Sequence, residues 1–546
     1  MSQAVAPLRI RHFRSLWIAS IFSNVGSFLQ AVAGAWLMLE LTGSATWVGL
    51  MAASTTLPLL FLALAAGAVA DLVNRGMVLL ISQIVMGLAA AGMAILTALD
   101  LVTPGRLLAL SLLLGVGVAF NLPAWQAMVP DLVPRGMVAS AVALNSVAFN
   151  VARAVGPALG GLIVATAGPA LAFMLNALSY LGVIAVLAVL VRRFGSADRD
   201  ASSVANAIAN GVRFARFTRP FRMLLLLAAL FALTSAVVQT VLPNRTEELG
   251  GSADAFGLLL GAMGLGALIG AFTRQQVVEA LGARSIPITI STFGVAGIAT
   301  GLAPTIWWTA PGLLLAGMAW VWTLTTTNAT AQLMSPEWVR GRAMSLYSLA
   351  FVGILPLGSI LAGTIADLIG AGAAIVVLSV GSVALGMTAP RFGIPALADV
   401  VSPEFTVEQA PDPHVVTEGG PVMVVNTWRV NSQNLDDFLR VMTEIRLVRL
   451  RTGAYRWRLY RNASDPHRLS EIFLTVSWDE HLAQHRRIDD ASADLIRRAR
   501  SFDEGDGPTT RHLVAVDVDH PEDWEPLLAA HDEYHRHDGS IPLSSD

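Results

Sequence analysis

The chain has 546 residues, of which 54% are hydrophobic and 14% are charged, and its mean hydropathy is +0.60. Soluble domains carry about 25% charged residues, so this composition indicates a membrane protein, while a net charge of -3 says little about partners. The absence of cysteine excludes disulfides, thiolate metal sites and a cysteine nucleophile, and the absence of lysine excludes the GxxxxGK[ST] phosphate loop of an ATPase.

Twelve apolar stretches follow one another before Arg391, and a helix needs about 20 such residues to cross a bilayer. The expected spans are residues 15–40, 46–70, 77–99, 105–129, 137–167, 170–191, 222–244, 254–280, 285–303, 307–333, 342–367 and 371–390. Prolines inside the spans predict kinks, which membrane helices tolerate. These are Pro58, Pro123, Pro157, Pro243, Pro287, Pro311 and Pro356.

Arginine is distributed unevenly about these spans. If every span crosses the membrane, one side carries Arg9, Arg11, Arg14, Arg75, Arg135, Arg192, Arg193, Arg274, Arg284, Arg340, Arg342 and Arg391. The other side carries only Arg106 and Arg245. Because basic loops stay in the cytoplasm, we expect a multi-pass protein of the cytoplasmic membrane with both termini inside. The first span lacks a small-residue cleavage site and is expected to be retained.

The two halves of the membrane region repeat one another. FRxL at 13–16 recurs at 221–224, and GSAxxxGL at 43–50 recurs at 251–258, both 208 residues later. An Arg-Gly pair before the fifth span recurs 205 residues later, before the eleventh. Two parallel six-helix bundles with a site near the midplane between them form a known transporter plan.

The remaining segments are polar. We expect a first bundle in 1–192, a central loop with an interfacial amphipathic helix (or an ordinary basic loop) in 193–220 and a second bundle in 221–393. A Pro-rich linker (394–420), a soluble domain (421–519) and a mobile tail (520–546) follow. Alternating strands at 422–430, 455–460, 469–478 and 512–518, with helices from Asn434 and over 480–500, predict a βαββαβ ferredoxin-like unit.

The fifth span carries Arg153, a charge at membrane depth that should face a cavity or a partner rather than lipid. Gly156, Pro157, Gly160 and Gly161 follow at once, and such residues thin and bend a helix where another helix approaches closely. We therefore expect a bent, closely packed helix with one buried cation, as in a moving part of a transporter. Generic small-residue packing is the alternative.

A sequence at the end of the second span, Gly67-x-x-x-Asp71-x-x-Asn74-Arg75, resembles the GxxxDRxGR loop motif of the major facilitator superfamily, with Leu72 and Asn74 departing from the pattern. The alternative is an acidic helix cap. The resemblance implies a twelve-helix major facilitator fold, so the fold class expected is an all-α membrane protein plus a C-terminal α+β ferredoxin-like domain.

The fifth span is similar to the antiporter motif of exporters in that superfamily, although Ala152 stands where glycine is usual. The chain as a whole resembles the enterobactin-exporter-like group, also called transmembrane secretion effectors. The segments that carry this resemblance are 122–124, 129–134, 152–161 and 340–344, and in the soluble domain 449–460 and 477–485. The resemblance implies a proton-driven exporter of siderophores, drugs or other hydrophobic metabolites.

Polar and aromatic side chains inside the spans are candidates for the substrate route, although helix–helix hydrogen bonding is an alternative for each amide. They are Asn24, Gln30, Asn121, Gln126, Asn145, Asn150, Arg153, Gln239, Trp320, Asn328 and Gln332, with Trp322 as a second aromatic wall. Candidate gating residues are Gly67, Asp71, Arg75, Gly156, Pro157, Gly160, Gly161, Arg340 and Arg342. Proton coupling needs a membrane group that titrates, for which Glu40 and Asp71 are the candidates.

The soluble domain resembles the antibiotic-biosynthesis-monooxygenase-like fold, which usually pairs into dimers, so the role expected of it is homodimerisation or regulation. His481 and His485 have metal-ligand spacing, but a surface helix is the favoured interpretation. We expect no cofactor, no metal, no enzyme activity and no nucleic-acid partner; the partners expected are a small-molecule substrate and the lipid bilayer. The alternatives to an exporter are an importer or symporter of the same fold, and a membrane-tethered enzyme or sensor acting through this domain.

Overall fold

The computed structural model describes residues 3–62, 66, 74–128, 132–191, 201–397, 421–505 and 507–515. The chain forms two compact units. The first consists of Met1–Ala205, Met223–Gln332 and Met344–Val400. The second consists of Asn206–Arg222, Leu333–Ala343 and Val401–Asp546. Parts of the expected linker (394–420) and the whole expected tail (520–546) lie outside the described residues.

The first unit is helical throughout its described core. Its helices are α1 (Arg11–Thr42), α2 (Ala45–Ser54), α4 (Arg75–Ala98), α5 (Pro104–Met128), α6 (Val138–Ala167), α7 (Pro169–Leu190), α9 (Arg219–Thr240), α10 (Leu242–Glu248), α11 (Ala253–Leu281), α12 (Ser285–Leu302), α13 (Ile306–Met334), α14 (Arg340–Val352), α15 (Leu355–Ile369) and α16 (Ala371–Thr388). Helices α9 and α14 begin in the second unit and continue into the first.

Within the described residues, ten helical stretches are long and apolar enough to cross a membrane. They include eleven of the twelve expected spans, because α11 and α12 lie in one stretch, Ala253–Leu302, and only Ala45–Leu62 of the second span is described. The remaining span, the tenth in chain order and expected at 307–333, is helix α13 of 29 residues. The mostly helical membrane fold is confirmed.

Three of the expected kinks are interruptions of the helix. Pro58 and Pro243 stand near the start of a new helical segment, and Pro356 is the second residue of α15, which begins after a two-residue break that follows α14. Proline lacks an N–H and fits a first helical turn, where that group needs no partner. Pro123, Pro157 and Pro311 instead lie inside continuous helices.

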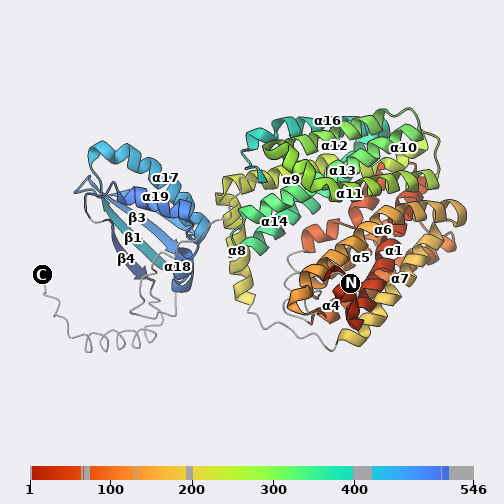
Figure 1. Ribbon diagram of the computed structural model, residues 1–546, viewed down its shortest axis with the longest axis horizontal. Helices are drawn as coiled ribbons and strands as arrows, with labels where there is room; N and C mark the ends of the chain where they lie inside the picture. The colour runs from red at the N-terminus through yellow and green to blue at the C-terminus, as the bar shows by residue number, and fades with distance from the viewer. Residues whose placement is uncertain are drawn as a thin grey trace. The chain divides into compact units, whose positions relative to one another are not determined.

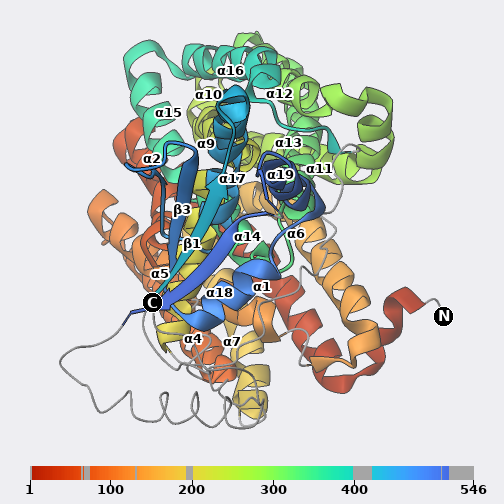
Figure 2. The same ribbon diagram turned by 90° about the vertical axis from the view of Figure 1, so that its left-hand side faces the viewer.

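The helices of the first unit group into two halves, which are coloured red to orange and green to teal in Figure 1; in the perpendicular view of Figure 2, α2 of the first half lies beside α15 of the second. In the first half α1 packs on α6 and α7, and α4 packs on α5 and α7. In the second half α12 packs along α16. One buried cluster of the first half, which includes Leu16, Leu79, Met128 and Leu187, joins four of these helices.

We name the two ends of these helices by residues that lie there. At the Gly43 end, Gly43, Gly168, Gly250 and Gly370 take positive φ angles between successive helices. The Arg75 end is the opposite end, where α4 begins.

The second unit contains a four-stranded antiparallel sheet of order β2-β3-β1-β4. The strands are β1 (Val422–Arg429), β2 (Arg456–Arg461), β3 (Arg468–Thr475) and β4 (Thr509–Val514), and the helices are α17 (Leu435–Thr452), α18 (Trp478–His485) and α19 (Asp490–Arg500). Helices α17 and α19 lie along one face of the sheet (Figure 1). The order βαββαβ is as expected. We call residues 421–515 the C-terminal module.

A single helix over 480–500 is wrong. The chain forms α18 and α19, separated by a turn at 486–489. The Asp489 side chain accepts a hydrogen bond from the backbone N–H of Ser492, and an aspartate that caps in this way starts a new helix.

The second unit also includes two segments from the helical region: α8 (Ala201–Phe217) with the start of α9, and the connection 333–343 that leads into α14. The expected helix in the central loop is therefore present. The sequence placed both segments outside the soluble domain, whereas the structure groups them with it.

Candidate functional site between the two helical halves

The Arg153 guanidinium lies over an aromatic ring from the opposite half. Its Cζ is 4.4 Å from the centroid of the Trp320 ring, and both residues stand near the middle of their helices, α6 and α13. The Trp320 ring in turn lies 5.9 Å from Phe351 at the end of α14. A cation over an indole face is attracted by the ring quadrupole, and more strongly where water is scarce. Two of the residues proposed from the sequence for the substrate route are thus brought together between the halves.

Helices α6 and α11 meet along a line of small residues. A Cβ at Gly161 would lie 2.5 Å from the carbonyl oxygen of Ala253 and 2.7 Å from Cα of Gly257, so only glycine fits there. A Cβ at Gly264 would lie 2.6 Å from the carbonyl oxygen of Arg153 itself. Such contacts between backbones need small residues on both helices. The halves therefore touch from the Gly43 end down to Arg153.

The other glycines of the motif pack within the first half. A Cβ at Gly156 would lie 2.6 Å from Cβ of Phe28, and one at Gly160 would lie 3.1 Å from Cα of Leu29, both on α1. Pro157 is buried in α6, and a Cβ at Gly257 would lie 2.6 Å from its carbonyl oxygen. The motif therefore serves two contacts: one with α1 inside the half and one with α11 across the halves.

A carboxylate from the second half caps a helix of the first half at the Gly43 end. Asp367 of α15 accepts hydrogen bonds from the backbone N–H groups of Ala45 (2.6 Å) and Thr46 (3.0 Å) and from the Ser44 hydroxyl (2.7 Å). A helix N-terminus carries unsatisfied N–H groups and a partial positive charge, so it stabilises an anion. Close packing supports this contact, because a Cβ at Gly49 would lie 2.5 Å from the carbonyl oxygen of Ser359.

A second acidic cap lies within the second half. Glu248 accepts hydrogen bonds from the backbone N–H groups of Ala371 (2.5 Å) and Gly372 (3.1 Å), and Arg245 pairs with it at 2.9 Å. The sequence analysis predicted neither Asp367 nor Glu248 as a helix cap. A signal was present, since both acids stand near glycines that separate helices.

Several candidate route residues bond to neighbouring helices or to their own. The Asn176 amide of α7 donates to Gln30 (2.5 Å), and the Gln83 amide of α4 donates to Asn121 (3.0 Å). Gln332 donates to Asn328 one turn away, and Asn150 donates to the carbonyl of Ser146. Trp322 donates its indole N–H to Thr273 at 3.1 Å. These contacts match the helix-bonding alternative for amides.

The other candidate residues differ in their exposure. Asn24 and Asn145 are half-buried in α1 and α6, while Gln126 and Gln239 are exposed on α5 and α9. Glu40 is exposed at the Gly43 end and accepts from the Trp36 indole at 2.6 Å. Arg75 begins α4, whereas Gly67 and Asp71 lie outside the described residues. Arg340 and Arg342 belong to the second unit.

The C-terminal module has a buried ion pair. Glu471, fully buried on β3, lies 3.3 Å from Nε of Arg449 and accepts from the Trp457 indole (2.9 Å) and the Asn426 amide (2.7 Å). A buried carboxylate needs such compensation. All its partners are the module's own side chains, so we assign this network to the module core.

Three histidines of the module lie close together. The His481 ring centroid is 4.8 Å from those of His485 and His512, so the sequence missed a third imidazole supplied by β4. Burial, with smaller contributions from His485 and His512, lowers the pKa of His481 to about 3. In the described part of the chain, no group of three histidine, cysteine or acidic residues is arranged to hold a metal ion.

Comparison with known proteins now adds to this geometry. A family model described as transmembrane secretion effector matches residues 2–520. The chain belongs to the transmembrane secretion effector family. A curated relative of this transmembrane secretion effector is the multidrug efflux pump Tap of Mycolicibacterium fortuitum, which is 27% identical over 380 residues, covering 68% of this chain and 93% of the relative.

Two other relatives are named for siderophores. The Staphyloferrin A transporter of Staphylococcus aureus is 26% identical and covers 64% of this chain and 89% of its own length. Enterobactin exporter EntS of Salmonella choleraesuis is 25% identical and covers 69% of this chain and 90% of its own length. This secretion effector is therefore a membrane transporter of the major facilitator superfamily, and its family and relatives are transporters rather than enzymes.

Solved structures show the same fold. A bacterial homologue of the human lysosomal transporter Spinster, in an inward-facing and unoccupied conformation, matches with a TM-score of 0.57 at 16% identity, covering 73% of this chain and all of that chain. A bacterial homologue of the iron transporter ferroportin, in an inward-facing state, matches with a TM-score of 0.53 at 17% identity, over 69% of this chain and 98% of that one.

Proposed function

We propose that this secretion effector is a secondary-active exporter that moves a small hydrophobic, drug-like or siderophore-like molecule across the cytoplasmic membrane by alternating access. The relatives named as efflux pumps and as an enterobactin exporter support the direction of transport. The Arg75 end faces the cytoplasm in this proposal, because most loop arginines of the sequence would lie on that side.

The observation that carries the proposal is the Arg153–Trp320 pair at 4.4 Å between the halves. Placing an arginine inside the bilayer costs free energy, so an arginine found there usually has a functional role. Here the guanidinium can bind a carboxylate or catecholate oxygen of a substrate, while the indole offers a flat face to an aromatic part. The pair joins the two halves, so a substrate bound there would contact both.

The contacts at the Gly43 end support a state that opens toward the Arg75 end. Asp367 caps α2 across the halves, and the Trp36 ring of α1 stacks on Phe256 of α11, with centroids 6.1 Å apart and planes at 22°. Release of the substrate on the far side would require these contacts to separate while the Arg75 end closes. Alternating access in such folds is largely the rocking of one half against the other.

We propose protons as the driving ion, on the resemblance to proton-driven exporters. Glu40 remains a candidate for the coupling group: it is exposed at the Gly43 end, where it can exchange protons with the outer solution. Asp71 remains the other candidate from the sequence. Exchange of either for its amide should uncouple export from the proton gradient while leaving substrate binding in place.

The C-terminal module is proposed to be accessory to transport, with pairing of two copies as one of its roles. The sheet face opposite α17 carries Met423, Val425, Ile472 and Leu474 at its centre, and Leu513 on β4 is 52% exposed. An apolar face of this kind can pair with a second copy. Light scattering of the detergent-solubilised protein with and without residues 400–546 tests this role.

The test of the transport proposal uses inside-out membrane vesicles, a proton gradient and a fluorescent planar drug. Wild type should accumulate the drug, whereas Arg153→Ala and Trp320→Ala should not, although both insert in the membrane. Trp322→Phe is the matched control, because this tryptophan on the same helix bonds to Thr273 instead. Gradient-driven uptake by right-side-out vesicles only would establish an importer. Wild-type transport by Arg153→Ala would refute the site.

A further inference from the structure

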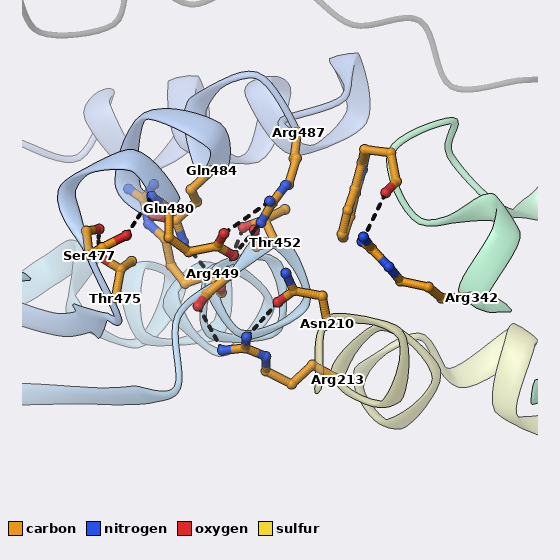
Figure 3. A network of polar contacts seen from close by, with 12 residues as sticks. Asn210, Arg213, Arg342, Arg449, Thr452, Thr475, Ser477, Glu480, Gln484 and Arg487 are labelled. Carbon is orange, nitrogen blue, oxygen red and sulfur yellow. Dashed lines mark hydrogen bonds and ion pairs between the residues drawn. The ribbon is translucent and has the colours of Figure 1, made fainter. Parts of the chain in front are cut away.

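The C-terminal module contacts two segments of the helical region, and all three belong to the second unit. The module contributes the end of α17 and the side chains of Glu480 and Arg487. The helical region contributes Arg213 on α8 and Trp338 in the connection 333–343. Figure 3 shows the guanidinium groups of Arg213 and Arg487 near the end of α17. We call this set of contacts the module joint.

Two arginines cap the C-terminus of α17. Arg213 donates from Nη1 to the carbonyl of Gly453 at 2.9 Å, and Arg487 donates to the carbonyl of Thr452 at 2.7 Å (Figure 3). The last carbonyls of a helix lack partners inside the helix, and the helix dipole is negative there. A cation on α8 is thus held by the module through backbone atoms, which ties α8 to the end of α17.

Arg487 also contacts the connection 333–343. Its Cζ lies 4.6 Å from the centroid of the Trp338 ring. Glu480 fixes the orientation of the guanidinium with two hydrogen bonds, of 2.5 and 3.1 Å. Burial lowers the pKa of Arg213; the charge of Glu480 opposes this, and the charge of Arg487 adds a smaller lowering. Glu480 is therefore the carboxylate that balances the cations of the joint.

Helix α8 packs on the start of α14 beside this contact. A Cβ at Gly211 would lie 2.8 Å from Cβ of Arg342, so the α8 backbone passes directly over that side chain. Phe214 of α8 meets the Trp338 ring edge-on, with centroids 6.2 Å apart and planes at 86°. Arg342 donates to the carbonyl of Trp338 at 3.4 Å. The joint therefore holds the first turn of α14.

Helix α14 is the short first part of an interrupted span. It ends at Val352, and α15 begins at Leu355. A Cβ at Gly353, in the break, would lie 2.8 Å from the Leu60 side chain of the first half. Near the same break, Phe351 contacts Trp320, the ring beneath Arg153. One end of α14 is thus held by the joint, and its other end touches the proposed substrate site.

We propose that the C-terminal module is a regulatory domain that slows transport by holding α8 and the start of α14 through Arg213 and Trp338. This inference rests on the proposed function, because its effect is on the transport cycle. In this proposal α14 moves about the break at Gly353 when the halves rock, and a helix fixed at its first turn moves less readily. Release of the joint frees α14 and speeds the cycle.

The first experiment removes the joint from the side of the helical region and measures initial efflux rates in proteoliposomes. Arg213→Ala and Trp338→Ala should each raise the rate about fivefold. Arg216→Ala, a loss of the same charge from an exposed position one turn along α8, should leave it unchanged. Deletion of residues 400–546 should raise the rate equally, and Arg213→Ala should add nothing to the deletion.

The second experiment restores the joint with a covalent link. Because the chain has no native cysteine, only the introduced cysteines can react. The double variant Trp338→Cys and Arg487→Cys should transport quickly until a short bifunctional thiol reagent links the two positions, and then about fivefold more slowly. The transport rate of each single-cysteine variant should not change when the reagent is added. Equal rates in all proteins, or slower transport on release, would overturn the regulatory role. Absence of transport in every protein, wild type included, would instead refute the proposed function.

Discussion

Asp367→Asn removes the carboxylate that joins the halves at the Gly43 end. The native side chain accepts three hydrogen bonds, of 2.6, 2.7 and 3.0 Å, from the first turn of α2 and Ser44. A buried hydrogen bond to a charged group contributes about 1.5–3 kcal/mol. Because Asp367 is exposed to solvent, we assign about 0.5–1 kcal/mol to each of its three hydrogen bonds. An asparagine keeps one acceptor oxygen and loses the charge that favours a helix N-terminus. The closed state should lose about 1–2 kcal/mol, which raises the ratio of open to closed protein about 5- to 30-fold.

Labelling of a single cysteine measures this shift, since the chain has none of its own. Ala253 is 4% exposed beside Gly161, so Ala253→Cys should react slowly with a membrane-impermeant maleimide added at the Gly43 side. Adding Asp367→Asn should speed the reaction by about the same 5- to 30-fold. Asp254→Asn is the control, because that half-buried acid at the same end bonds to Ser252 of its own half. If the Ala253→Cys protein reacts at the same rate with and without Asp367→Asn, the Asp367 contact does not hold the halves together at the Gly43 end.

Three further predictions follow from the packing and charges. Gly161→Ala should open the Gly43 end in the same labelling assay, because its methyl group would meet the α11 backbone at 2.5–2.7 Å, whereas Gly182→Ala, whose nearest neighbour would be Cβ of Ala19 at 3.8 Å, should not. Glu471→Leu should lower the free energy of urea unfolding of the C-terminal module by about 3–5 kcal/mol, because it leaves the Arg449 charge buried without its partner. Glu504→Leu, which breaks an exposed pair with Arg429, should lower it by only about 0.5 kcal/mol. Equal losses in the two variants would contradict the importance of the buried pair. His481 has a pKa of about 3 when folded and 6.5 when unfolded, so the unfolded chain binds the extra proton and stability falls as pH drops below 6.5. Hydrogen exchange of the β3 amides, corrected for intrinsic rate, should show a loss of about 2 kcal/mol at pH 5 that His481→Phe abolishes.

The sequence predicted the parts of the site that depend on helix position. A charge in the middle of an apolar span is costly beside lipid, so Arg153 could be expected to face a cavity or a partner. Trp320 was one of the aromatic candidates on another span. The glycines of α6 could be expected to meet other helices. Which glycine met which helix could not be predicted, because a rotation of only about 100° around α6 separates Gly160, which meets α1, from Gly161, which meets α11.

Two features depended on distance through space rather than along the chain. Asp367 and Ala45 are 322 residues apart, and nothing local marks an acid at one helix end as the cap of another helix. The module joint likewise unites Arg213 with Gly453, 240 residues later, through a backbone carbonyl that any residue would supply. The turn that divides α18 from α19 was not predicted, because Asp489 lies inside the predicted helix 480–500, whereas its side chain caps the start of α19.

The central claim is that the positive charge at position 153 acts on substrate from the cytoplasmic side. Arg153→Cys, in this chain without cysteine, should be inactive in inside-out vesicles. Modification with an aminoethyl thiosulfonate, which restores a positive charge, should recover part of the efflux, whereas a methyl thiosulfonate should not, and bound substrate should slow both reactions. Wild-type efflux by the unmodified Arg153→Cys protein, or a cysteine that neither reagent reaches from that side, would contradict the account.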